Sequence, residues 1–150
     1  MTRGDIIKEL KQYFNIKELV CPHTLKEWKE KSWQFLTTEI LHTLLVIRRD
    51  ILKVPLVCNT STLTQRGLRC NLCEIVKNKT MNNILYLSSH HNGLGLDISS
   101  PKMSAENMRK LIKQNADLLP YPIRMENDVN WLHIDCYDNC DGHKINFFDP

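Results

Sequence analysis

Two histidines and an aspartate in the second half of the chain have the types and the spacing that suit a metal ion. His90 precedes Asp97 by seven residues, with two glycines between them, and His133 follows within residues 131–135. Two imidazoles and one carboxylate form a ligand set that leaves the fourth position of a catalytic zinc ion open for water. Glycine between ligands allows a loop to turn sharply and to approach a metal closely. We therefore predict a zinc site formed by His90, Asp97 and His133.

Other interpretations of these residues stay open from the sequence. His91 is a competing ligand, although it fits the spacing to Asp97 less well. Taken alone, each residue is more typical of a structural role, as a surface-loop histidine, a turn aspartate or an inward strand histidine. The two spacings together favour a metal site. The alternating pattern of residues 94–98 predicts that Asp97 lies on a strand and that His90 lies in the loop before it.

The same residues carry a resemblance to a known family. Residues 88–97, Ser-x-His-x-x-Gly-x-Gly-x-Asp, are similar to the Ser-x-His-x-x-Gly-x-Ala-x-Asp signature of the zinc D,D-carboxypeptidase/L,D-endopeptidase family, which shares its fold with the hedgehog signalling domain. Residues 131–135, Trp-Leu-His-Ile-Asp, resemble the strand that carries the third zinc ligand of that family. The resemblance covers roughly residues 34–137, and its main support is spacing.

The resemblance also implies roles for residues near the metal. Ser88 would support the site through a hydrogen bond behind the ligands, or it would simply end the preceding strand. Arg66, followed by Asn71, corresponds to an arginine that would hold the substrate carboxylate or the developing oxyanion. Arg69 lies in the same loop, and a solvated loop arginine is the alternative for Arg66.

The general base is the point where this sequence departs from the family. Family members have Glu or Asp three residues before the last ligand histidine, whereas this chain has Asn130, which cannot accept a proton. Glu126, Asp128 and Asp135 are the carboxylates nearby. Asp135 lies two residues after His133, so both side chains face the same side of a strand. We therefore assign Asp135 as the base, with the alternative that it only orients a ligand.

Six cysteines offer a second constellation. The pairs Cys70-x-x-Cys73 and Cys136-x-x-x-Cys140 have metal-ligand spacing. A second zinc site with four thiolate ligands would form if the long loop folded back over the last strands. Buried free thiols, or a disulfide between the pairs, are the alternatives.

The composition is that of an ordinary globular protein. The 150 residues are 42% hydrophobic and 25% charged, which suits a single domain over residues 1–150. The net charge of +3 is too small to argue for a nucleic-acid partner, and no apolar run is long enough for a membrane span. The N-terminus lacks the apolar core of a signal peptide, so we expect synthesis in the cytoplasm and reduced thiols. Cys21 and Cys58 are expected to fill core space.

The pattern of apolar residues predicts an α+β fold, with helices packed on a small antiparallel sheet. Helical spacing predicts helices over residues 5–14, 33–52 and 104–119. Strands are predicted over residues 56–59, 94–98, 123–126, 131–137 and 144–148. Residues 60–80 are polar and are expected to form a long loop with one helical turn.

Together, the residues and the resemblance predict a zinc metallopeptidase that hydrolyses peptide bonds in peptidoglycan stem peptides. A small domain of this kind fits a phage or prophage protein that acts at the cell wall, as an endolysin or as a virion component. The alternative is a catalytically inactive zinc-binding relative, used as a structural or binding module beside other virion proteins, and Asn130 favours it. A cytoplasmic dipeptidase is a third interpretation.

Overall fold

Four short strands form one mixed sheet with the order β1-β3-β2-β4. The computed structural model covers residues 1–150, and its strands are β1 (Gly95–Ile98), β2 (Ile123–Glu126), β3 (Leu132–Asp135) and β4 (Ile145–Phe148). The predicted α+β class is confirmed. The prediction of a wholly antiparallel sheet is wrong at one strand, because β4 runs parallel to β2. β3 already has a neighbour on each side, so β4 pairs with the free edge of β2.

Side-chain alternation gives the sheet one apolar face and one polar face. The apolar face is completely buried, and it consists of Leu96, Ile98, Ile123, Met125, Leu132 and Ile134. It belongs to the main hydrophobic core, together with residues from the helices. The intervening residues, which include Asp97 on β1 and His133 on β3, therefore point to the opposite face. This polar face is where the sheet can present chemically active groups.

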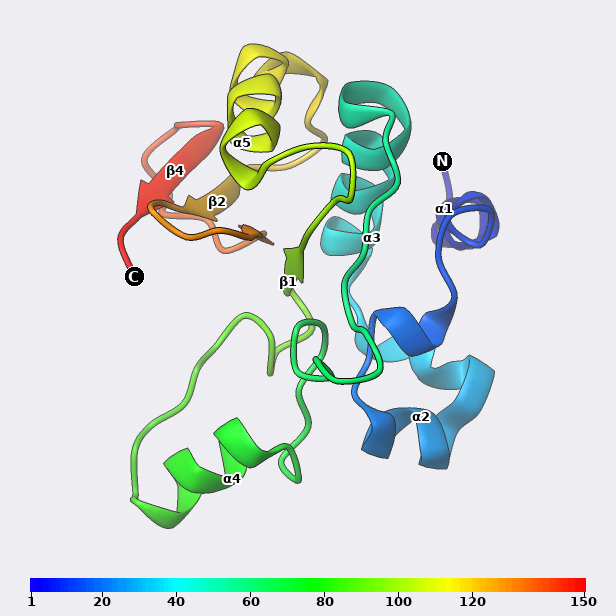
Figure 1. Ribbon diagram of the computed structural model, residues 1–150, viewed down its shortest axis with the longest axis vertical. Helices are drawn as coiled ribbons and strands as arrows, with labels where there is room; N and C mark the ends of the chain where they lie inside the picture. Colours follow the sequence, from blue (N-terminus) through cyan, green and yellow to red (C-terminus); the bar gives the residue numbers. More distant parts are fainter.

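Three helices supply the other side of the core, close to where helical spacing predicts them. They are α1 (Arg3–Leu10), α3 (Thr38–Val46) and α5 (Ala105–Gln114), and each begins after a threonine or serine cap. A π-helical turn, Ile47–Leu52, extends α3, and a 3-10 helix, Lys29–Phe35, precedes it. Figure 1 shows α3 and α5 close together beside the sheet. None of the helices is both long and apolar enough to cross a membrane.

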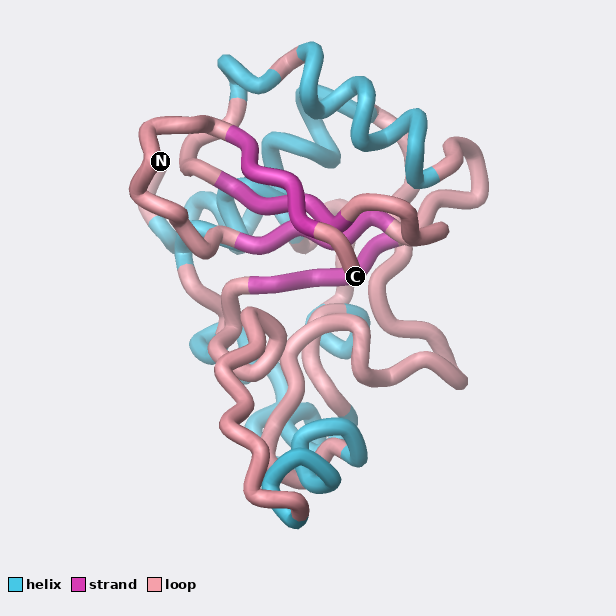
Figure 2. Tube along the Cα trace, turned by 90° about the vertical axis from the view of Figure 1, so that its left-hand side faces the viewer, coloured by secondary structure: helices cyan, strands magenta, loops and turns pink.

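The remaining segments form a loop-rich end of the molecule, away from α5. It contains α2 (Pro22–Trp28) and α4 (Glu74–Met81), and Figures 1 and 2 show both helices at this end, with the strands gathered in the other half. The polar stretch predicted as a loop thus contains two turns of helix. The predicted strand at residues 56–59 is reduced to a single bridge between Val57 and Ser99.

Candidate metal centre on the polar face of the sheet

Strand pairing brings the three predicted ligands together. Asp97 on β1 lies directly opposite His133 on β3, so both side chains emerge side by side on the polar face. The loop before β1 adds His90, whose Nε2 lies 3.2 Å from Asp97 Oδ2. His133 Nδ1 lies 2.8 Å from Asp97 Oδ1. One ligand atom from each of the three residues lies within 4.8 Å of the others, so the group could hold a metal ion.

The sharp turn between His90 and Asp97 depends on Gly93. This glycine has a φ of +70°, and a Cβ atom there would lie 2.1 Å from the Phe35 carbonyl oxygen. Both the positive φ and the close approach exclude an ordinary side chain. The Thr37 amide donates a hydrogen bond to the Gly93 carbonyl, which fixes the turn against the start of α3. The loop between His90 and Asp97 is thereby held in place against α3.

Hydrogen bonds behind the two imidazoles orient them as metal ligands. His90 Nδ1 lies 3.0 Å from the Gly67 carbonyl oxygen, and His133 Nε2 lies 2.7 Å from Asp135 Oδ2. With those nitrogens protonated and donating, the lone pairs of His90 Nε2 and His133 Nδ1 are directed at Asp97. Metal-ligating histidines are held in this way in most metalloproteins. The residues present therefore fit a divalent metal with nitrogen and oxygen ligands.

Without a metal, the same three residues are strongly coupled in charge. Burial alone would lower the pKa of His133, but its hydrogen bonds to Asp135 and Asp97 raise that pKa to about 9. Burial alone would raise the pKa of Asp97, but hydrogen bonds from His133 and His90 hold it well below its usual range. The metal-free site is thus a proton-bridged cluster, and a metal ion must displace the proton on His133.

Asp135 sits behind the metal ligands and is fully buried. Its carboxylate accepts two hydrogen bonds from Arg124, both of 2.9 Å, and one of 3.0 Å from the Tyr137 amide. Burial would raise the pKa of Asp135, but hydrogen bonds from His133 and Arg124 outweigh that effect and lower it. A carboxylate held in this way is suited to orienting His133. Of the two roles that the sequence leaves open for Asp135, this geometry favours the positioning role over that of a base.

A cleft with polar and aromatic walls opens at these ligands. Besides the three ligands it is lined by nine residues: Arg69, Leu87, Ser88, Ser89, Arg124, Glu126, Trp131, Tyr137 and Phe148. Glu126 is the carboxylate on this wall that is neither a ligand nor paired with an arginine. Asn130, at the position of the family's base, is exposed and is not part of the lining. The Trp131 indole nitrogen is buried and has no hydrogen-bond acceptor in the protein.

Arg66 does not face this cleft, contrary to the role that the resemblance implies for it. Its guanidinium donates hydrogen bonds to the Cys58 carbonyl at 3.2 Å and to the Ser99 hydroxyl at 2.6 Å. Arg69 takes the place by the ligands, with Nη2 3.7 Å from Asp97 Oδ2. The two arginines are three residues apart in an irregular loop, so the sequence gives no periodicity that could tell them apart.

Two further expectations near the histidine motif can be compared with the geometry. The Ser88 hydroxyl accepts a hydrogen bond of 3.2 Å from the His90 amide, so this serine supports the backbone of a ligand. His91, the competing ligand, does not join the group. Its Nδ1 lies 2.9 Å from the Arg69 carbonyl oxygen instead.

The four cysteines expected to form a second site do not meet. The Cys136 sulfur lies 3.6 Å from the Thr43 hydroxyl, and burial raises the pKa of its thiol to about 12. Cys140 is exposed. Cys70 and Cys73 instead lie with two residues from the N-terminal part of the chain, Cys21 and His23, in a group that could hold a metal ion. The sequence feature that could have predicted this group is a second pair of closely spaced metal donors, Cys21-Pro-His23.

Comparison with known proteins gives no further guidance, because the chain matches no protein-family model, no curated protein and no solved structure.

Proposed function

We propose that this protein is a zinc metallopeptidase that hydrolyses peptide bonds in peptidoglycan stem peptides. One observation carries the proposal. Two imidazoles and a carboxylate converge on one point beside a cleft, and the outer nitrogen of each imidazole is held by a hydrogen-bond acceptor. A structural histidine cluster has no need for this orientation. Zinc in this position would polarise the scissile carbonyl and lower the pKa of an attacking water to about 7.

The residues around the ligands support hydrolysis more than simple metal storage. Glu126 lies on the cleft wall and on the same face of β2 as Arg124, which pairs with Asp135 across the sheet. In this proposal Glu126 accepts the proton of the attacking water and transfers it to the leaving amine. Arg69, at the edge of the ligands, holds the substrate carboxylate in the role first assigned to Arg66.

The choice of substrate rests on the resemblance of residues 88–97 and 131–135 to the D,D-carboxypeptidase/L,D-endopeptidase family. Stem peptides carry carboxylates that suit a cleft with Arg69 in its lining. A phage or prophage origin, with action at the bacterial cell wall, is part of the same proposal, because a small domain of this kind fits such a protein. The second candidate is a catalytically inactive zinc-binding module of a phage particle. Asn130, in place of the usual base, is the observation that favours it.

The test is hydrolysis of purified peptidoglycan by the zinc-loaded protein, followed by mass spectrometry of the released peptides and by assay of new amino groups. We expect cleavage within stem peptides that is lost in the His133→Ala variant. His143→Ala is the matched control, because its imidazole is exposed and lies outside the group. If the zinc-loaded protein cleaves no stem peptide from walls of several chemical types, the inactive module is the better description.

A further inference from the structure

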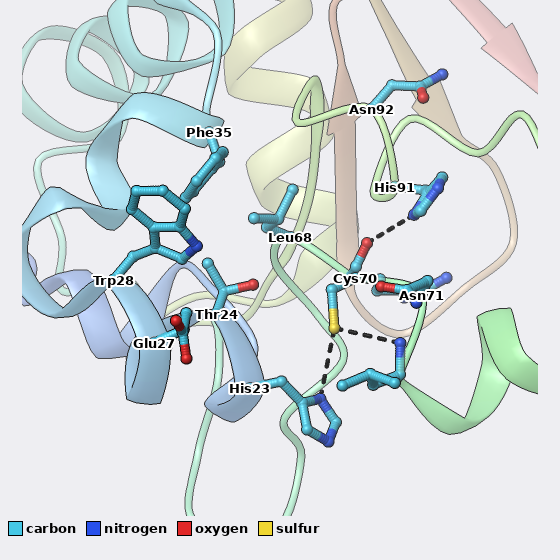
Figure 3. A pocket seen from close by; sticks show the side chains of 12 residues that line it. His23, Thr24, Glu27, Trp28, Phe35, Leu68, Cys70, Asn71, His91 and Asn92 are labelled. Atoms are coloured by element: carbon cyan, nitrogen blue, oxygen red, sulfur yellow. Dashed lines mark hydrogen bonds between the residues drawn. The ribbon is translucent and has the colours of Figure 1, made fainter.

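A second group of metal-binding side chains lies at the loop-rich end of the molecule, between α2 and α4. Cys21 and His23 come from the start of α2, Cys73 is the residue just before α4, and Cys70 lies three residues before Cys73. His23 Nδ1 lies 3.5 Å from the Cys70 sulfur and 3.8 Å from the Cys73 sulfur, and the two sulfurs are 4.0 Å apart. Figure 3 shows the His23 ring and the Cys70 sulfur facing one another.

These separations match the edges of a zinc tetrahedron. With Zn–S bonds of about 2.3 Å and Zn–N bonds of about 2.0–2.1 Å, tetrahedral geometry places two sulfurs about 3.8 Å apart and a sulfur and a nitrogen about 3.5 Å apart. A disulfide would require sulfurs about 2.0 Å apart. We propose that Cys21, His23, Cys70 and Cys73 bind one zinc ion as a closed structural site. Three thiolates and one imidazole favour zinc over harder divalent ions.

Backbone contacts hold the two halves of this group together. The Cys21 amide donates a hydrogen bond of 3.0 Å to the Leu68 carbonyl, and the Leu68 amide donates one of 2.9 Å to the Leu19 carbonyl. Gly67 permits this approach, because a Cβ atom there would lie 2.2 Å from the Leu19 carbonyl oxygen. The chain then turns tightly at Cys70, whose sulfur accepts a hydrogen bond of 3.4 Å from the Leu72 amide. Cys21 and Cys70 are thus brought together by backbone contacts.

The surrounding segment has a small hydrophobic core. Its own hydrophobic cluster contains three buried residues, namely Cys21, Cys73 and Val76, and α4 is mostly exposed. Small units without a sufficient core commonly depend on a metal ion or a disulfide. The six cysteines are free thiols, so no disulfide serves this purpose. A zinc ion would therefore supply stability that packing does not.

The loop segment that carries Cys70 also contacts the first metal centre. The Gly67 carbonyl, which orients His90, is three residues before Cys70. The Arg69 amide donates a hydrogen bond of 3.1 Å to the His90 carbonyl. The Cys70–Cys73 turn would hold this segment in place, so zinc at the cysteine site would steady the first centre without touching it.

Cobalt substitution tests the proposal independently of peptidase activity. The probe is Co²⁺ added to metal-free protein that carries His90→Ala, Asp97→Ala and His133→Ala, in which the first centre is removed. We expect one equivalent of cobalt, with intense thiolate-to-cobalt charge-transfer absorption and the visible bands of tetrahedral cobalt. Zinc should then displace the cobalt stoichiometrically. Tight cobalt binding without a thiolate band, or no binding, would overturn the proposal.

Cysteine variants in the same background identify the ligands. Cys70→Ser with Cys73→Ser should abolish the thiolate band, whereas the control Cys136→Ser with Cys140→Ser should leave it unchanged. If the first pair does not fold, thiol labelling of the otherwise unaltered chain decides. Cys140 should react at once, and Cys21, Cys70 and Cys73 should react only after a strong chelator is added. Immediate labelling of all three in the zinc-loaded protein would refute the site.

Discussion

Asp135 holds His133 from behind, with Oδ2 2.7 Å from Nε2, while Asp97 occupies the opposite nitrogen of the same ring. The imidazole is therefore fixed between two carboxylates. Asp97, at Nδ1, can share a metal ion with His133, whereas Asp135, at Nε2, lies on the side of the ring away from that ion. This relationship separates a ligand from a positioning residue, although both are aspartates on neighbouring strands. It also leads to a direct test of the role of Asp135.

Replacing Asp135 with Asn should weaken zinc binding at the first centre by about 10–100-fold, because the charged carboxylate that accepts from His133 Nε2 is replaced by a neutral amide. Competition with a chromogenic chelator measures this change, and Asp138→Asn, at an exposed site, is the control. Peptidase activity should return toward the unaltered level when zinc is saturating. If activity stays low with zinc fully bound, Asp135 takes part in proton transfer after all.

The Glu126→Gln variant should lower the rate of stem-peptide hydrolysis by about a hundred-fold or more, because the cleft loses its proton acceptor. Zinc content should remain that of the unaltered protein, since Glu126 is not among the ligands. Asp128→Asn is the matched control, because Asp128 is exposed two residues after the end of the same strand and Asn tolerates its φ of 54°. Equal rates for the two variants would remove Glu126 from the mechanism.

The two loop arginines should respond differently to truncation. Arg66→Ala should lower the free energy of unfolding by about 1–3 kcal/mol, because the Cys58 carbonyl loses its partner in the protein interior. Its effect on KM should be small. Arg69→Ala should raise KM for stem peptides, because a charge beside the ligands is lost. Urea unfolding and steady-state kinetics on both variants separate the effects, and an increase in KM confined to Arg66→Ala would reverse the assignment.

The metal-free protein should have its greatest stability in mildly acidic solution. The pKa of His133 is raised to about 9 in the folded state, so its contribution is complete below about pH 6.5 and is lost as the pH rises through 9. The pKa of Asp97 is lowered, so its contribution is complete above about pH 4 and is lost as the pH falls. Between pH 6.5 and 9 we expect a loss on the order of 1–3 kcal/mol.

Urea unfolding of chelator-treated protein across this range measures the loss. The His133→Ala variant is the control, and its stability should vary much less between pH 6.5 and 9. If the unaltered metal-free protein were equally stable at both ends of the range, His133 would not be protonated between Asp97 and Asp135 in the folded state.

The sequence was sufficient for most of the elements and for the spacing of the first centre, but it missed most of α4 and predicted a strand at residues 56–59 where the structure has a single bridge. The alternation of residues 94–98 predicts a strand that carries Asp97, a second strand is predicted over residues 131–137 with His133 on it, and helical spacing predicts the cores of α1, α3 and α5. These are local properties, because the period of a helix or strand decides which side chains share a face. The helix ends differ from the predicted ones, because they depend on individual capping hydrogen bonds, such as those of Thr2 and Thr37.

Tertiary structure decided which of these segments meet. The pairing of β1 with β3 places Asp97 opposite His133, β4 pairs in parallel with the free edge of β2, and the bridge between Val20 and Leu68 brings Cys21 to Cys70. Neither the loop path that turns Arg69 toward the ligands nor the one that carries Cys136 away from Cys70 has a local signature. The physical reason is that such contacts depend on packing between segments far apart in the chain, whereas sequence periodicity reports only the face that each segment must bury.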